Sequence, residues 1–256
     1  MTNLIASEKY KFVRSKALYV TLVGLLVVVV GFLTGSVYSY FVYGEMGAPG
    51  YQGIYTPTAL DILLVLWFPV FIAYFAGMEF QNKTVNNALC LGKSRLAVYL
   101  AKLLAIFAGV AAMTLLVVTV TTIVQSVVFG FGAMTISEYL PYFLRIVGLQ
   151  LIFLCAVASL FTMLAFIAQT PLMTMALGIG YIIFSSALQQ MVAVLFDGQL
   201  AFIREWFPSY YQVALAMQGL HGGDPAPVLR GIAVSFIWAV VTTFVGVSVF
   251  KKKDLK

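Results

Sequence analysis

The chain has 256 residues, of which 62% are hydrophobic and only 9% are charged, and its formal net charge is +6. A soluble domain carries about 25% charged residues because its surface faces water, so this composition excludes an ordinary soluble enzyme or binding domain. At roughly 20 residues for each membrane-spanning helix, with short connections, the length predicts about six spans.

Six apolar runs follow one another along the chain, and each is long enough to cross about 30 Å of hydrocarbon as a helix. They cover residues 17–38, 62–78, 96–129, 146–168, 172–196 and 231–250. The head before them, residues 1–16, mixes apolar and basic side chains and favours a helix along the inner membrane surface. No small-residue cleavage site follows the first run, so we interpret that run as an uncleaved span. The fold class predicted is an all-α membrane protein with six transmembrane helices.

Basic residues gather on one side of the predicted membrane. The head, the loop between spans two and three with its edges, and the tail hold twelve of the fifteen lysines and arginines. The positive-inside rule then places both termini in the cytoplasm, which requires an even number of spans. The net charge therefore reflects topology, and no nucleic-acid partner is predicted.

The residues that could support catalysis are few and scattered. Cys90 and Cys155 are interpreted as free thiols, and His221 has no second His or Cys nearby with which to hold a metal. Residues 92–94 resemble the end of a phosphate-binding loop, but Asn87 stands where that loop needs glycine, so no ATP site is predicted. Ionisable residues are nearly absent from the middle of the spans, which argues for an energy source outside this chain.

The polar and basic segment 79–95 is the most informative connection. It keeps apolar residues at Val85 and Leu89, four positions apart, and ends near Gly92, a residue type that commonly follows a helix. This pattern predicts a short amphipathic helix at the inner surface. Such a helix could dock into a cytoplasmic partner, but an interfacial loop that supplies positive charge explains the pattern equally well.

The longest outer connection, residues 197–230, is too polar to span the membrane and too aromatic for a free loop. Aromatic side chains favour the membrane–water boundary, so short helices on or in the outer leaflet are predicted. Passive anchoring explains them, and an external gate is the functional alternative. The gate candidates are Phe202, Trp206, Phe207, Tyr210 and Tyr211.

These features together resemble the ABC-2 type permeases, the membrane subunits of a class of ATP-driven exporters. The shared features are six spans with both ends inside, an external helical segment before the last span, and a basic head that contains Glu8, Lys9 and Arg14. The most specific feature is a pattern between spans two and three. It consists of Phe75, Glu79, Thr84, Asn87, Leu89, Gly92, Ser94, Arg95 and Lys102.

The resemblance implies one ABC-2 type transmembrane domain over residues 1–256, with an interfacial head (1–16), a cytoplasmic coupling loop (79–95) and an external interfacial segment (197–230). It implies that the coupling helix sits in a groove of a separate cytoplasmic ATPase, which binds ATP and Mg²⁺, so that this chain binds no cofactor and is not itself an enzyme. Two ATPases and two permeases, identical or different, would form the working unit. The coupling residues carried over are Glu79, Lys83, Thr84, Val85, Asn87, Leu89, Gly92, Ser94 and Arg95.

The small size and compact loops are most similar to permeases of bacitracin-resistance and lantibiotic-immunity exporters. They imply a bacterial plasma-membrane protein in contact with lipid that exports an amphipathic or hydrophobic substrate, such as an antimicrobial peptide. The alternatives are an ion-coupled secondary carrier or channel, a non-transporting scaffold or sensor subunit, and a membrane-embedded enzyme. The last would need clustered His, Glu, Asp or Ser in the spans, whereas the acids here are scattered and His221 is alone.

Overall fold

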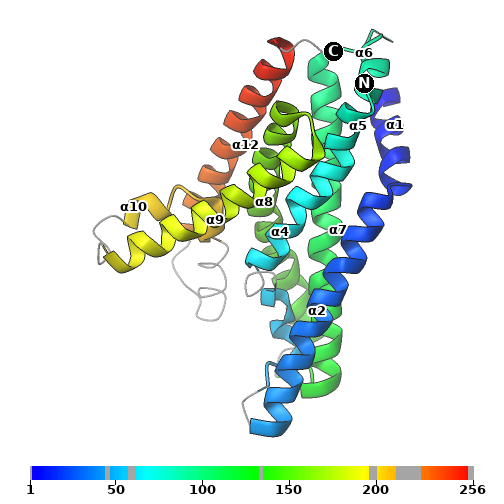
Figure 1. Ribbon diagram of the computed structural model, residues 1–256. Helices are drawn as coiled ribbons and strands as arrows, with labels where there is room; N and C mark the ends of the chain where they lie inside the picture. Colours follow the sequence, from blue (N-terminus) through cyan, green and yellow to red (C-terminus); the bar gives the residue numbers. More distant parts are fainter. Residues whose placement is uncertain are drawn as a thin grey trace.

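The computed structural model describes residues 2–43, 47–56, 61–90, 92–132, 135–195, 201–211 and 226–252, and these residues contain helices and no strands (Figure 1). Six helical stretches are long and apolar enough to cross a membrane, which confirms the six predicted spans. They are α2 (Lys16–Tyr43), the continuous helix made of α4 (Asp61–Ile72), η2 (Ala73–Gly77) and α5 (Met78–Gln81), α7 (Arg95–Phe129), α8 (Ile136–Ala168), α9 (Pro171–Leu195) and α12 (Ala226–Lys252).

Several of these helices extend beyond the apolar runs that predicted them. Helix α8 begins at Ile136, ten residues before the predicted start, and α12 begins at Ala226, five residues before. The first of the added turns of α8 is stabilised by a capping box, in which the backbone N–H of Thr135 donates to the Glu138 carboxylate over 3.0 Å. Hydropathy marks only the part of a helix that lies in hydrocarbon, whereas capping decides where the helix ends.

In the described part of the chain, four shorter elements accompany the spans: α1 (Thr2–Val13), the 3₁₀ helix η1 (Gly50–Tyr55), α6 (Thr84–Cys90) and α10 (Ala201–Arg204). Helices α1 and α6 lie where the sequence favoured helices in the head and in segment 79–95. Both chain ends and α6 lie at the same end of the bundle, which we call the basic end, while α9 leans away from the other spans (Figure 1). The positive-inside rule predicts that the basic end is cytoplasmic.

The main hydrophobic core runs through the middle of the bundle. It joins α2, α4, α7 and α8 through large buried side chains such as Leu25, Phe68, Ile106 and Phe161. Helix α8 is the most deeply buried of the six spans, and α9 and α12 are among the most exposed. The bundle therefore presents its last two spans to lipid or to another subunit.

Helix η1 is a feature of the connection between the first two spans that the sequence did not predict. It packs against α7, where the hydroxyl of Thr121 donates to the carbonyl of Gly53 over 3.1 Å. The side-chain amide of Gln150, on α8, donates to the carbonyl of Ile54 over 2.9 Å. Polar side chains of two spans thus satisfy the backbone of η1, as irregular backbone beside a membrane requires.

We expect Gly53→Ala to destabilise the protein by about 1–3 kcal/mol, the usual cost of overpacking. A Cβ atom at Gly53 would lie 2.6 Å from the backbone nitrogen of Thr122, so either η1 or α7 must shift. Gly31→Ala on α2 is the matched control, because no atom lies within 4 Å of the Cβ position there. Thermal unfolding of both variants in detergent measures the difference, and equal melting temperatures would contradict the close packing of η1.

Candidate functional site

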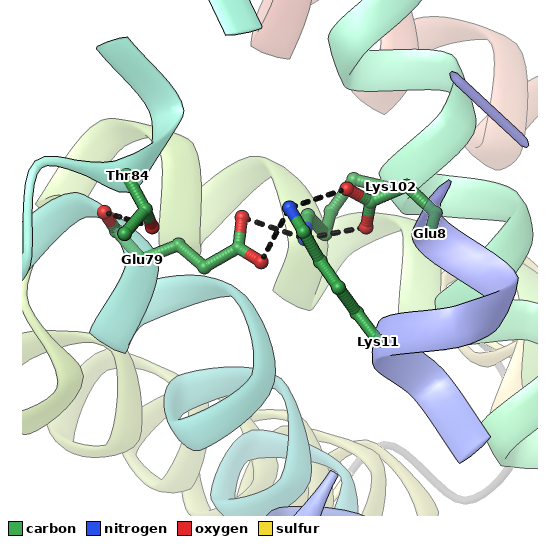
Figure 2. Close-up of polar contacts among 5 residues, drawn as sticks. All are labelled: Glu8, Lys11, Glu79, Thr84 and Lys102. Carbon is green, nitrogen blue, oxygen red and sulfur yellow. Dashed lines mark hydrogen bonds and ion pairs between the residues drawn. The ribbon is translucent and has the colours of Figure 1, made fainter. Parts of the chain in front are cut away.

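Four charged side chains meet at the basic end in a closed group that we call the ion cluster: Glu8 and Lys11 from α1, Glu79 from α5 and Lys102 from α7 (Figure 2). The Lys102 ammonium lies 2.6 Å from the Glu8 carboxylate and 2.8 Å from that of Glu79. The Lys11 ammonium lies 3.1 Å from Glu8 and 3.3 Å from Glu79. Each cation thus contacts both anions, and the cluster joins three helices.

The solvent exposure of the four side chains in the ion cluster increases from one side of the cluster to the other. The side chain of Lys102 is 2% exposed and that of Glu8 is 8% exposed, whereas Glu79 is 18% and Lys11 is 41% exposed. Removing a charge from water costs several kcal/mol unless partners compensate. Two carboxylates compensate Lys102, and its ammonium also lies 4.6 Å from the centre of the Phe75 ring, where a cation is attracted to the ring face.

The ion cluster stabilises the charged forms of Glu8 and Lys11 over a wide range of pH. Burial alone would raise the pKa of Glu8, but the ammonium groups of Lys102 and Lys11 outweigh burial and hold this pKa below its ordinary value of 4.5. Burial alone would lower the pKa of Lys11, but Glu79 and Glu8 hold it above its ordinary value of 10.5. Stability from Glu8 is therefore lost only as the pH falls through its lowered pKa, and stability from Lys11 only as the pH rises through its raised pKa.

Local sequence features bring α6 back to the bundle beside the ion cluster. Helix α5 ends at Gln81, and Lys83 adopts a left-handed conformation with φ 57°, which turns the chain before α6 begins. Helix α6 is followed by Gly92 with φ 74°, whose N–H donates to the carbonyl of Leu89 over 2.9 Å. This is the left-handed ending for which glycine is suited.

Helix α6 has two different faces. Its inner face packs on an apolar group that we call the junction cluster, where Val85 is 4% exposed and Leu89 is partly buried. The buried members of this group are Leu4, Val85, Val98, Tyr99, Ala101, Leu103, Phe166, Val247 and Phe250. The outer face is polar and exposed, with Thr84, Asn87 and Cys90 on α6 and Lys83 just before it.

The structure places the predicted coupling residues in different settings. Glu79 belongs to the ion cluster, and its carbonyl accepts a hydrogen bond from the Thr84 hydroxyl over 3.2 Å (Figure 2). The Ser94 hydroxyl accepts from the backbone N–H of Ala97 and caps α7. Arg95 donates to the carbonyls of Phe250 and Lys251 at the end of α12. These residues hold the segment to the bundle, while Lys83 and Asn87 face outward with Gly92.

The five gate candidates do not gather at one point. Phe202 and Trp206 are exposed, at 58% and 56%, whereas Tyr211 is buried against Phe153 of α8. The indole N–H of Trp238, on α12, donates to the carbonyl of Trp206 over 2.7 Å, and its ring lies near Phe207. The segment is therefore anchored to α8 and α12, and its role as a gate stays a prediction. Residues 196–200 and 212–225, with His221, lie outside the described residues.

Sequence reasoning missed the ion cluster as a site, although it used Glu8, Glu79 and Lys102 to find the resemblance. A signal was present, because Lys102 lies inside a predicted apolar run, where an ionisable group needs a partner. Glu8 and Glu79 are two of the three acids on the predicted cytoplasmic side. In the part of the chain that the structure describes, no three His, Cys, Asp or Glu side chains gather in a way that could hold a metal ion.

The fold and the ion cluster define the class of this chain. It is a helical membrane protein with six spans, in which charged side chains join the head to the end of the second span. Residues 4–185, from α1 into α9, match the family model described as ABC-2 family transporter protein, and this range contains the whole ion cluster and α6. The chain therefore belongs to the ABC-2 family and is a multi-pass permease subunit of an ABC transporter. Comparison with curated proteins finds no match.

We expect Lys102→Met to lower the free energy of unfolding by about 3–5 kcal/mol, because it leaves Glu8 and Glu79 without their most buried cation. Adding Glu8→Gln and Glu79→Gln to this variant removes the unpaired charges and should restore part of the loss. The control is Lys93→Met, which removes an exposed lysine near the same end. Thermal unfolding in detergent measures all three, and a loss for Lys102→Met no larger than the control would contradict a buried network.

Proposed function

We propose that this chain forms the translocation pathway of an ATP-driven exporter in the bacterial plasma membrane and takes its energy from a separate cytoplasmic ATPase. The observation that carries the proposal is the two-faced helix α6. Its inner face is held by the junction cluster, the ion cluster holds the preceding helix α5, and the outer face of α6 is exposed for a partner. Members of the ABC-2 family generally work with such an ATPase.

The described contacts form a path along which a force on α6 reaches the spans. Val85 links α6 to the junction cluster, which includes Val98 of α7, Phe166 of α8 and Phe250 of α12. Glu79 links the preceding helix to Lys102 of α7 and to the head. A push on the outer face of α6 therefore acts on several spans at once, which is what alternating access needs from a coupling helix.

The distribution of charge supports an external energy source over an ion-coupled carrier. Such a carrier keeps an ionisable group near the middle of the membrane. Lys102 is buried in α7 but lies near the basic end, about 10 Å from the start of the helix at 1.5 Å per residue. Two carboxylates neutralise its charge there, so it is not the ionisable group that such a carrier needs. ATP and Mg²⁺ are accordingly assigned to the ATPase, and two ATPases with two permeases, identical or different, form the proposed working unit.

The proposed cargo is an amphipathic or hydrophobic molecule, with an antimicrobial peptide as the leading candidate. The resemblance to bacitracin-resistance and lantibiotic-immunity permeases supports this assignment. The exposed apolar side chains of α9, such as Leu177, Ile183 and Phe184, offer a surface suited to such molecules or to lipid. Export follows from the same resemblance.

Copurification with the ABC ATPase encoded nearest to this chain tests the energy source. We expect the two proteins to form a complex that hydrolyses ATP. We expect the double variant Lys83→Glu and Asn87→Trp to bind the ATPase at least about tenfold more weakly, because a reversed charge and a bulky side chain at an interface both lower the binding free energy. Lys9→Glu is the matched control, since Lys9 is also exposed at the basic end but lies on α1. Subunit ratio and hydrolysis rate are the measurements.

A chain that purifies alone and drives uptake or export from an ion gradient would replace the exporter with a secondary carrier. Binding that survives the double variant but is lost with Lys9→Glu would move the ATPase contact from α6 to the head. The variants change only exposed side chains, so their melting temperatures should stay near that of the parent.

Coexpression of the chain and its ATPase in a peptide-sensitive bacterium tests the cargo. We expect a several-fold rise in the concentration of bacitracin or of a lantibiotic that stops growth, and loss of this rise in the double variant. An unchanged growth limit for both peptides, with a normal complex in purification, would reject the peptide cargo and leave the ATP-driven transporter in place.

A further inference from the structure

The helix that carries Glu79 contains a turn of unusual geometry. Between α4 and α5, residues Ala73–Gly77 form the π-helical turn η2, which holds about one residue more per turn than an α-helix. Its residues are buried except for Tyr74, which is 50% exposed. Single π turns of this kind are rare and are frequent at functional sites.

The extra residue allows two faces of one helix to be satisfied together. On the membrane side of η2, Phe68, Phe71 and Ile72 are fully buried in the main core. On the other side, Glu79 faces Lys102. A regular α-helix turns by about 100° per residue, and the π turn accommodates one extra residue. If η2 were α-helical and α4 kept its place in the main core, Glu79 would therefore face about 100° away from Lys102.

Two contacts between this helix and α9 offer little resistance to a turn about the helix axis. Pro69 lacks an N–H and so weakens the helical hydrogen bonding one turn before η2. Its ring lies against Gly178 of α9, where a Cβ would be 2.6 Å from the proline ring carbon. Gly77 lies against Pro171, with its Cβ position 3.1 Å from the Pro171 Cα. At these two contacts with α9 glycine supplies one side, so no interlocked side chains oppose a rotation there. Elsewhere the rotation must move the ring of Phe80 on α5, whose centre lies 4.9 Å from that of Phe166 in the junction cluster.

The ion cluster can release Glu79 without leaving a buried charge unpaired. Lys102 would keep Glu8, whose carboxylate is 2.6 Å away and is the more buried of the two acids. Glu79 is the more exposed of the two acids and lies at the basic end, so it is the one whose removal from the cluster costs less. The hydroxyl of Thr84 bonds the carbonyl of Glu79, so α6 would move with α5.

We propose that η2 is a rotational switch for the coupling segment. When η2 relaxes from a π turn to an α-helix, α5 turns by about 100° and Glu79 moves away from Lys102. The switch rests on the proposed function, because an ATPase seated on the outer face of α6 supplies the force. It divides the permease into a part that moves with the ATPase, α5 and α6 with their Phe80 and Val85 contacts in the junction cluster, and a part that keeps its contacts in the main core, α4.

Pulsed spin-label distances in the purified permease–ATPase complex test this switch. The reporter pair is Lys9→Cys on α1 with Gln81→Cys at the end of α5, both exposed, in a background with Cys90 and Cys155 replaced by serine and alanine. A rotation of 100° at the surface of a helix 10–12 Å wide displaces a residue by about 8 Å. We expect a shift of that size when ATP and vanadate trap the complex. The second pair, Lys9→Cys with Leu63→Cys before η2, should not change.

Removal of Tyr74 is the diagnostic variant. It takes the extra residue out of η2, so the turn closes as an α-helix while Phe71 and Glu79 keep their present directions. We expect this variant to bind the ATPase and to show no shift of the Lys9–Gln81 pair on trapping. A shift equal to that of the parent would overturn the switch.

The parent complex decides the proposal even if the deletion does not fold. An unchanged Lys9–Gln81 distance in a complex that hydrolyses ATP would overturn the switch and leave the proposed function intact. Equal shifts of both label pairs would also overturn it, because they show the whole helix moving as a rigid body. A chain that binds no ATPase would reject the proposed function, and the switch falls with it.

Discussion

Lys102 places an ammonium group in an almost fully buried position at the second turn of α7, and the arrangement of the basic end follows from the need to neutralise it. Helix α1 must lie along α7 to bring Glu8 to this cation, and α5 must end beside it to bring Glu79. Lys11 then closes the cluster from its exposed side. One buried charge thus joins the head, the end of the second span and the third span.

The junction cluster gives the same end of the protein its apolar support. It brings α6 against α7, α8 and α12, and Arg95 bonds the carbonyls at the end of α12. Segment 79–95, which carries the sequence pattern shared with ABC-2 permeases, is therefore packed into the bundle through the inner face of α6. The polar outer face is left exposed, so that under the proposed function docking and transmission would use different residues of one short helix.

The two ends of the bundle are stabilised by different interactions. Charges and buried aromatic rings stabilise the basic end. At the other end, the side chains of Thr121 on α7 and Gln150 on α8 donate to backbone carbonyls of η1 and hold it against these two spans. Trp238 and Phe153 anchor the residues after α10. The exposed faces of α9 and α12 are left for lipid or a second subunit.

The sequence by itself determined the class of protein and the six spans, because apolar run length and charge bias are local or additive signals. The glycine at 92 favoured a short helix before it but left an interfacial loop open. The sequence also pointed to segment 79–95, but it could not assign the faces of α6. Val85 and Leu89 suggested a surface for a partner, and only the tertiary structure showed that the bundle itself covers them. The pairing of Glu8, Glu79 and Lys102, the packing of η1 and the π turn at Ala73–Gly77 were likewise decided by tertiary structure. Each depends on the distance and rotation between helices far apart in the chain, which no local pattern encodes.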